Sequence, residues 1–418
     1  MGLAERQLEL LNAAIAVAAK GNAFYQSKLA ACKGANGFES LDAYTRRMPF
    51  TSKQELADDY ESNPPYGTNL SYTLKEYTRL HQTSGTTGRP MAWLDTPESW
   101  NWIIGNWEAI WKACGAESGE TAAFPFSFGP FIGFWSAFEA ASRVGLRCIP
   151  LGGQQSLERL RMIFRYEPQW LCCTPTYALH LISVAAREDI DLSKSPVRKI
   201  IVGGEPGGSV PEVRQRIESG WGGARVFDHH GMTEVGPVTY SDLNEPQLLR
   251  VLHEGYFTEV IQPETGLPVD EGQVGELVLT TLGRNGSPLF RYRTGDLVKP
   301  VAVEGEDPRA FALEGGIIGR ADDMVVVRGI NLYPSAVDAV IRSFAEIGEY
   351  QVNISKSDSM FQAQIQVENL SEMEDGNLKE ALQKQLREVF ALRIPVEVAE
   401  AGKLPQFEMK AKRWNVSQ

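Results

Sequence analysis

The sequence predicts an α/β protein with a large N-terminal domain, built from mostly parallel sheets flanked by helices plus a β-rich subdomain, and a small C-terminal α+β domain. The chain has 418 residues, too many for a single hydrophobic core. Its composition, 43% hydrophobic and 22% charged, is that of a folded globular protein. Short apolar runs alternate with amphipathic helical stretches from about residue 95 to 235. That alternation indicates parallel βαβ units with helices on both faces of a sheet.

The elements of the large domain follow in order. An amphipathic helix is expected at the N-terminus, over MGLAERQLELLNAAIAVAAK. Thr96 and Pro97 predict the start of a helix, because Thr is a good N-cap and Pro fits the first helical position. The strand-like runs TAAFPFSF, LRCIPL, WLCCTP, RKIIVGG and ARVFDHH then alternate with helical stretches.

Residues 251–315 read as short strands separated by turn residues, which predicts the β-rich subdomain within about 240–318. We therefore expect an N-terminal domain over residues 1–318 and a C-terminal domain over 319–418. The second has strand-like VVVRG, YQVNIS, FQAQIQVE and PVEVAE, with helices from Pro334 and over LKEALQKQLREVF.

Charge and cysteine content exclude several classes of protein. The net charge of −12 argues against non-specific nucleic-acid binding, which needs a basic surface. The five cysteines are an odd number without C-x-x-C spacing, so we expect reduced thiols and neither disulfides nor zinc. No apolar run is long enough for a bilayer and the N-terminus has no cleavage-site pattern, so we expect a cytoplasmic protein.

The loop HQTSGTTGRP at residues 81–90 is a candidate anion site. Its hydroxyls and glycines allow a ligand to approach the backbone, and Arg89 adds a positive charge. The alternative is a plain hairpin turn between YTRLHQT and PMAWLD, since Ser, Thr and Gly are common in turns. The candidate residues are Thr83, Ser84, Gly85, Thr86, Thr87 and Gly88. The loop alone favours neither interpretation.

Four further stretches follow in order: DHHGMTEVG at 228–236, RYRTGDL at 291–297, GRADDMVVVRGIN at 319–331 and LPQFEMKAKR at 404–413. Together with TSGTTGRP they resemble the adenylate-forming, AMP-binding superfamily, and within it most closely the phenylacetate–CoA ligase-like branch. AFYQSKL also resembles an N-terminal stretch of that branch, and VGGEP resembles one of its turns. Several motifs in the right order are more specific than any one of them.

The resemblance implies an ATP-dependent carboxylic acid–CoA ligase. Such an enzyme forms an acyl-adenylate and pyrophosphate, and then an acyl-CoA thioester with release of AMP. It uses ATP, Mg²⁺ and coenzyme A. The resemblance also implies that the small domain is a mobile lid that rotates at Asp322, and that Gly329 leaves room for the pantetheine arm.

Roles for single residues follow from the same resemblance. The loop would hold the β- and γ-phosphates, and Glu234 would bind Mg²⁺, which takes few protein carboxylates. Asp296 would accept hydrogen bonds from the ribose hydroxyls, because a carboxylate offers two acceptor oxygens. Lys410 would contact the carboxylate and the α-phosphate, with Lys412 as the fallback. Arg293 and Arg320 are candidates for phosphate or ribose contacts.

The turn that carries Glu234 departs from the family pattern. His230 stands where the family has an aromatic Tyr that stacks on adenine, and His229 is beside it. An imidazole can stack on adenine or bind the substrate, and both interpretations stay open. The nucleotide-site candidates on this stretch are Asp228, His229, His230, Gly231, Met232 and Thr233.

The acyl pocket is expected at FPFSFGPFIGFW, whose aromatic residues indicate an aryl or arylacetic acid. The alternative is that these rings are core, where aromatic residues dominate burial. The candidate substrate residues are Phe128, Gly129, Phe131, Phe134, Gly203, Gly204 and Glu205. His253 has no later cysteine to form the zinc site of some branch members, so no zinc is predicted.

Two other functions stay open at this point. The acyl group could pass to an amine or to a carrier protein instead of CoA, or the chain could be a catalytically inactive nucleotide-binding homologue. The expected partner is a small-molecule carboxylic acid, with a carrier protein under the first alternative. No nucleic-acid or membrane partner is expected, and a homodimer is the commonest form if the chain assembles.

Overall fold

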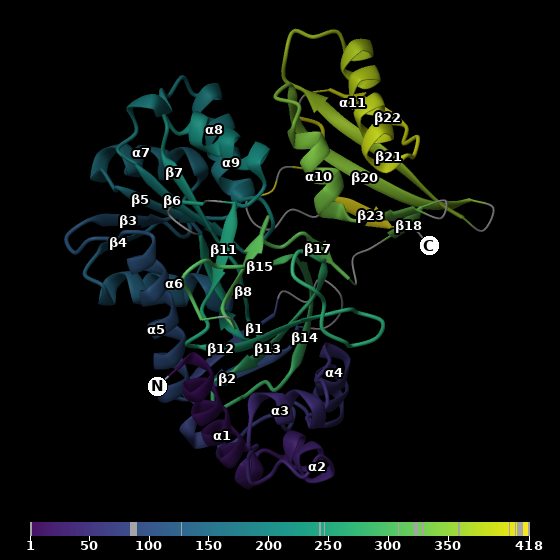
Figure 1. Cartoon of the computed structure of the whole chain (residues 1–418). Helices are drawn as coiled ribbons and strands as arrows, with labels where there is room; N and C mark the ends of the chain where they lie inside the picture. Colours follow the sequence, from purple (N-terminus) through teal and green to yellow (C-terminus); the bar gives the residue numbers. More distant parts are fainter. Residues whose placement is uncertain are drawn as a thin grey trace.

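The computed structural model describes residues 2–83, 90–126, 128–241, 244–245, 247–307, 309–321, 325–327, 330–357, 360–400, 402–405, 407 and 413–416. Two parts can be recognised in Figure 1. We call residues up to 321 the N-terminal part and residues from 325 the C-terminal part. None of the helices in the described ranges is long and apolar enough to cross a membrane. All five cysteines are free thiols.

Four helices begin the chain and pack together at one end of the molecule (Figure 1). They are α1 (Leu3–Gly21), α2 (Ala23–Ala31), α3 (Leu41–Arg47) and α4 (Lys53–Ser62). The apolar faces of α1, α2 and α3 share a core with Phe257, Leu282 and Phe290 of the β-rich region. Helix α4 begins with a capping box, in which Ser52 and Glu55 satisfy each other's backbone N–H groups. This cap fixes Lys53 as the first residue of the helix.

A five-stranded parallel sheet lies at the centre of the N-terminal part, in the order β4-β3-β5-β6-β7. The strands are β3 (Thr121–Phe124), β4 (Arg147–Pro150), β5 (Trp170–Cys173), β6 (Lys199–Gly203) and β7 (Arg225–His229). The helices are α5 (Pro97–Ala113), α6 (Ile132–Arg143), α7 (Ser156–Tyr166), α8 (Pro175–Arg187) and α9 (Pro211–Gly220), with a short 3-10 turn η2 (Leu192–Lys194). Two apolar cores, one on each face, confirm the predicted flanked parallel sheet. The carboxyl ends of its strands meet at one edge, where α/β proteins bind ligands.

Antiparallel sheets form the rest of the N-terminal part. One has the order β12-β13-β14-β17 and the other β10-β11-β16-β15, and β1-β2 and β8-β9 are two-stranded. The first-named strands are β12 (Tyr256–Ile261), β13 (Gly275–Thr281), β14 (Tyr292–Val298) and β17 (Gly319–Arg320). The second sheet contains β10 (Thr239–Ser241), β11 (Leu248–Val251), β15 (Pro300–Ala302) and β16 (Phe311–Glu314). The two hairpins are β1 (Arg79–Gln82) with β2 (Ala92–Asp95), after the 3-10 turn η1 (Leu74–Glu76), and β8 (Gly231–Met232) with β9 (Gly236–Pro237).

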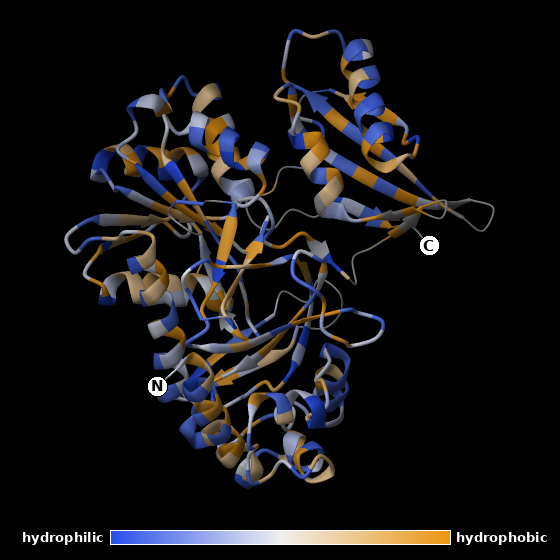
Figure 2. Cartoon of the chain, in the orientation of Figure 1, coloured by the Kyte–Doolittle hydropathy of each residue, from blue (hydrophilic) through white to orange (hydrophobic). Residues whose placement is uncertain are grey.

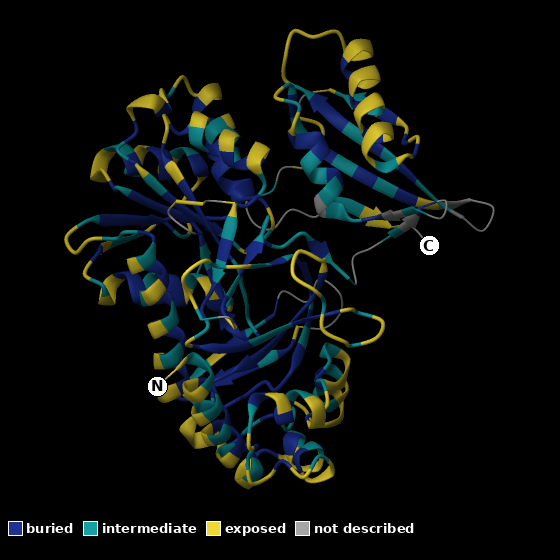
Figure 3. Cartoon of the chain, in the orientation of Figure 1, coloured by how far each residue is buried: buried dark blue, intermediate teal, exposed yellow. Residues whose placement is uncertain are grey.

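The C-terminal part has a core of its own around a six-stranded sheet. Its elements are β18 (Val325–Val327), β19 (Ile330–Leu332), α10 (Pro334–Arg342), β20 (Ile347–Ser357), β21 (Met360–Asn369), α11 (Asp375–Phe390), β22 (Val396–Ala399) and β23 (Trp414–Val416). Helix α11 is mainly hydrophilic and exposed on its outer face, whereas the central strands are largely buried (Figures 2 and 3). This α+β composition agrees with the predicted class.

The two parts meet where α10 packs against α9. Arg216 of α9 donates a hydrogen bond from Nη1 to the backbone oxygen of Ile347, 2.9 Å away at the start of β20. Burial lowers the pKa of Arg216, with a further lowering from the nearby Arg342. The exact boundary expected at residues 318–319 stays a prediction.

Candidate active site

Three side chains from separate elements meet at the carboxyl edge of the central sheet. His230 Nε2 lies 2.9 Å from Asp296 Oδ2, and Arg320 Nη1 donates to Asp296 Oδ1 over 3.0 Å. Asp296 lies opposite Arg320 in the ladder between β14 and β17, and only 3% of the surface of Asp296 is exposed. Each carboxylate oxygen can accept more than one hydrogen bond, so a carboxylate in this position suits a pair of hydroxyl donors.

Asp228 and His229 occupy buried positions at the end of β7, immediately before His230 in the chain. His229 Nδ1 is 2.7 Å from the backbone oxygen of Thr239, which can only accept, so this nitrogen carries the proton. The ring packs against Trp107 with centroids 4.3 Å apart, and burial lowers the pKa of His229 to about 4. Burial also raises the pKa of Asp228, to which Ser209 donates a hydrogen bond. The two adjacent histidines therefore differ in environment, and it is His230 that contacts Asp296.

Glu234 lies in the turn between β8 and β9, and only 6% of its surface is exposed. Lys53 at the start of α4 has its Nζ 3.9 Å from Glu234 Oε1. The backbone oxygens of Thr233 and Glu234 accept hydrogen bonds from Arg284 Nη1 at 2.7 and 2.9 Å. Gly231 and Met232 form the first arm of this turn, opposite Pro237 and Gly236. Neither Lys53 nor Arg284 was predicted from the sequence. The capping box could have located Lys53 at a helix start, but no local pattern connects it with Glu234.

The predicted phosphate loop connects β1 and β2, which pair antiparallel. Thr83 closes the base of this hairpin, because its N–H donates to Met91 O and its Oγ1 accepts from Met91 N, each over 3.0 Å. The hairpin and anion-loop interpretations are thus compatible, since the strands form the arms of the loop. The remaining loop candidates, together with Asp322, Gly329, Lys410 and Lys412, lie outside the described residues. These loop candidates are Ser84, Gly85, Thr86, Thr87 and Gly88.

The two candidate arginines occupy different surroundings. Arg320 contacts Asp296, as described above. Arg293 instead pairs with Glu276 and donates to the backbone oxygen of Pro263 over 2.8 Å. A nucleotide contact by Arg293 would therefore need its guanidinium to leave Glu276, and that contact stays a prediction.

The aromatic stretch expected to line the acyl pocket forms a connected cluster of rings. Phe134 stacks on Phe126 with centroids 3.8 Å apart, and Phe128 contacts Trp135 at 4.9 Å. The backbone oxygen of Gly129 accepts a hydrogen bond from Trp135 Nε1 over 2.9 Å. Phe131 is the N-cap residue of α6. These rings pack on one another at the carboxyl end of β3.

The glycines at the end of β6 leave the backbone little room. A Cβ at Gly203 would lie 2.8 Å from the backbone oxygen of His229, so a larger residue would not fit. Gly204 has a φ of +89°, in the left-handed region that favours glycine. Glu205 accepts a hydrogen bond from Thr176 N over 2.8 Å, which caps the N-terminus of α8. The carboxylate of Glu205 thus already has a structural partner.

A single carboxylate is compatible with Mg²⁺, which usually keeps several waters and phosphate oxygens in its shell. Among the described residues no cluster of three or more His, Cys, Asp or Glu residues could hold a metal ion alone. Glu234 therefore fits a metal that arrives with the nucleotide better than a resident metal centre.

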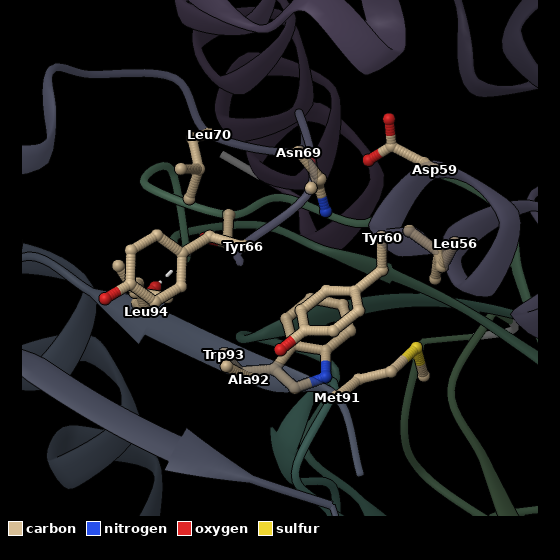
Figure 4. Close-up of a pocket in the computed structure, with 12 residues that line it drawn as sticks. Leu56, Asp59, Tyr60, Tyr66, Asn69, Leu70, Met91, Ala92, Trp93 and Leu94 are labelled. Carbon is tan, nitrogen blue, oxygen red and sulfur yellow. Dashed lines mark hydrogen bonds between the residues drawn. The ribbon is translucent and has the colours of Figure 1, made fainter. Parts of the chain in front are cut away.

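A small cavity lies beside the hairpin, between α4 and β2 (Figure 4). Its empty space is about 340 Å³ when the adjoining open solvent is included. Tyr60, Tyr66 and Trp93 contribute rings to its lining. Met91, which directly precedes β2, also lines it. It is separate from the Asp296 cluster, and none of the predicted site residues lines it.

Comparisons with known proteins agree with this architecture. Residues 74–283 match AMP-binding enzymes, and residues 329–415 match the C-terminal domain of AMP-binding enzymes. The chain is 29% identical to a phenylacetate–coenzyme A ligase of Pseudomonas putida, over 98% of this chain and 93% of the relative. It is 30% identical to the phenylacetate–coenzyme A ligase of Thermus thermophilus, over 80% of this chain and 74% of the relative.

A solved structure of 2-hydroxyisobutyryl-CoA ligase in the postadenylation state, with 2-HIB-AMP, superimposes with a TM-score of 0.91 at 26% identity. The match covers 99% of this chain and 89% of the other. The fold and the two matched regions define the class of adenylate-forming enzymes. The chain belongs to the AMP-binding enzyme family, and the resemblance to its phenylacetate–CoA ligase-like branch is confirmed.

The arrangement of the two parts can be compared with different states of that ligase. Its structure in the thioesterification state superimposes with a TM-score of 0.72, and so does an open conformation. The compared structures are of one ligase, so the different scores reflect how its parts are placed. The arrangement of the two parts is therefore more similar to the postadenylation structure of that ligase than to its other two structures.

Proposed function

We propose that this protein is an AMP-forming acid–CoA ligase, which activates a carboxylic acid with ATP and transfers the acyl group to coenzyme A. The observation that carries the proposal is the His230–Asp296–Arg320 cluster, in an AMP-binding chain, at the edge where parallel strands end. The named relatives are CoA ligases, and this chain matches them over most of their length, which supports the same reaction.

In the first half-reaction a carboxylate oxygen attacks the α-phosphorus of ATP, the bond to the β-phosphate breaks, and pyrophosphate leaves. The task is to bring two anions together and align them in line. Asp296 would orient the ribose by accepting hydrogen bonds from its hydroxyl groups. The loop and Lys53 would hold the phosphates, and Glu234 would hold a nucleotide-bound Mg²⁺. Such an ion neutralises charge on the phosphate oxygens.

In the second half-reaction the thiol of CoA releases its proton to solvent and its sulfur attacks the acyl carbonyl carbon. The bond from that carbon to the phosphate oxygen of AMP breaks, and AMP leaves with this oxygen deprotonated. We propose that Lys410 serves adenylation, that Asp322 absorbs the rotation of the C-terminal part, and that Gly329 lines the thiol's path.

The proposed substrate is an aromatic acid, because the ring cluster around Phe128 and Phe134 lies at the end of a central strand. A second candidate is a small branched or hydroxylated acid. The specific observation in its favour is the similarity to the structure of 2-hydroxyisobutyryl-CoA ligase, with a TM-score of 0.91 at 26% identity.

The test is ATP–pyrophosphate exchange with purified protein, ATP, MgCl₂ and a panel of aryl, arylacetic and small hydroxy acids. We expect acid-dependent exchange, and AMP release that CoA stimulates. Asp296→Asn should lose both activities, whereas the exposed control Asp270→Asn should keep them. Folded protein that exchanges with none of the acids would refute adenylation. Exchange without stimulation by CoA would instead support an amine or a carrier protein as acceptor.

A further inference from the structure

A fully buried ion pair lies under the turn that carries Glu234. Arg284 donates from Nε and Nη2 to the two carboxylate oxygens of Asp95, each over 2.7 Å, and both side chains are 0% exposed. Asp95 is the last residue of β2, and Arg284 lies in the loop between β13 and β14. Buried pairs of this kind are poor sources of stability, because desolvation offsets their attraction. The directions of the hydrogen bonds that such a pair makes say more about its role than its contribution to stability does.

The remaining guanidinium nitrogen of Arg284 points at the neighbouring turn. Nη1 donates to the backbone oxygens of Thr233 and Glu234 at 2.7 and 2.9 Å. One planar group therefore holds the arm of the phosphate-loop hairpin on one side and the Glu234 turn on the other. A guanidinium fixes both directions at once, which an ammonium cannot do.

The surroundings make Arg284 a rigid reference point. Ser287 Oγ donates to Leu94 O over 2.9 Å, and Gly286 N donates to Ser99 Oγ over 3.0 Å, so the loop of Arg284 is bound to the end of the hairpin and to α5. The Glu234 turn is held less by its own strands, since β8 and β9 have only the ladder pairs Gly231–Pro237 and Met232–Gly236.

We propose that Arg284 is a positioning residue for the adenylation site, with Asp95 as its anchor. It sets the distance between the Glu234 turn and the arm of the phosphate loop, so that the carboxylate and the loop reach the same Mg²⁺–nucleotide complex. This inference rests on the proposed function. It assigns to Arg284 no contact with substrate.

The chain offers a matched control. Arg291 pairs with Glu259 through Nε and Nη2 at 2.9 and 2.8 Å, and its Nη1 donates to the backbone oxygens of Thr45 and Met48 at 2.6 and 2.7 Å. The hydrogen-bond set is the same, but Arg291 holds the end of α3 instead of the Glu234 turn.

The experiment compares Arg284→Lys with Arg291→Lys in the full chain. The readouts are the Tm without ligand, the extra rise in Tm that MgCl₂ adds to ATP over ATP with EDTA, and the MgCl₂ concentration for half-maximal exchange. We expect both variants to lower the Tm without ligand. Only Arg284→Lys should lose most of the Mg²⁺-dependent rise and need about 10–100-fold more MgCl₂, as for other residues that orient metal ligands.

Equal behaviour of the two variants would overturn the proposal, and so would an unchanged MgCl₂ requirement in Arg284→Lys. If Arg284→Lys shows no cooperative unfolding, Asp95→Asn replaces it, with the same expected direction and the same contradicting result. Wild-type protein without acid-dependent exchange, but with a Mg²⁺-dependent rise in Tm that Arg284→Lys abolishes, would refute the proposed function and support the positioning role.

Discussion

The contact between α9 and β20 makes a quantitative prediction about the two parts. Removing the guanidinium in Arg216→Ala deletes the 2.9 Å hydrogen bond to Ile347 O, which exists only while the parts are placed as in this structure. A hydrogen bond contributes about 1 kcal/mol net, so its loss should make separation of the parts about fivefold more frequent. The hydrogen bond is only part-buried, so water can replace the guanidinium at the Ile347 oxygen while the parts are together, and no larger penalty is expected.

Hydrogen–deuterium exchange measures this separation directly, because exchange of interface amides follows the population of the open state. Peptides from α9 and α10 should exchange about fivefold faster in Arg216→Ala, while the strands of the central sheet stay unchanged. Gln215→Ala, an exposed neighbour on the same helix, is the control and should behave as wild type. Unchanged exchange at α9 and α10 would show that Arg216 does not hold the parts together.

Three further predictions concern the nucleotide site and the buried histidines. Asp296→Asn should weaken AMP binding about 10–100-fold in calorimetry, because bonds to a charged acceptor contribute about 1.5–3 kcal/mol. Lys53→Met should raise the KM for ATP about tenfold with little change in kcat, since a charge-assisted phosphate contact is lost from the nucleotide complex. The free energy of unfolding in urea should be highest above about pH 6.5 and fall as pH drops toward 4, because burial lowers the pKa of both His81 and His229 to about 4.

Controls separate these effects from general damage. Lys75→Met alters an exposed lysine and should leave the KM for ATP unchanged. The unfolded chain protonates near pH 6.5 while the folded rings stay neutral, so each ring costs about 1.4 kcal/mol per pH unit within that window. His229→Gln should therefore reduce the pH dependence. An equal pH dependence in the variant, or AMP binding by Asp296→Asn at wild-type strength, would contradict the respective reasoning.

The periodic features of the chain could be predicted from the sequence, because they are local. Strand–helix alternation gave the parallel sheet, and Thr96 and Pro97 do cap and begin α5. The contact between Asp296 and Arg320 could also have been predicted, because both lie in motif stretches only 24 residues apart. Both had been named as nucleotide-site candidates.

What the sequence could not provide is burial and the long-range pairing that it requires. Arg284, in the stretch TLGRNGSP, resembles an ordinary turn residue, yet its side chain is fully buried on Asp95, 189 positions away. Lys53 follows a helix cap, and only the fold brings it to Glu234. Arg293 illustrates the reverse case, because Glu276 from the neighbouring strand occupies its guanidinium. A motif names the residue type but not its competing partners.

The ladder between β14 and β17 has a thermodynamic consequence. Arg320, which bonds Asp296, is the last residue of the last strand before the proposed pivot at Asp322. Arg320 lies on the N-terminal side of that pivot, two residues away, so a rotation that disturbs the β14–β17 ladder would weaken its bond to the carboxylate in one arrangement and not in the other. Nucleotide affinity and lid orientation are then linked functions, and each must shift the other by the same free energy. Release of AMP would then favour return of the lid, and return of the lid would favour release of AMP.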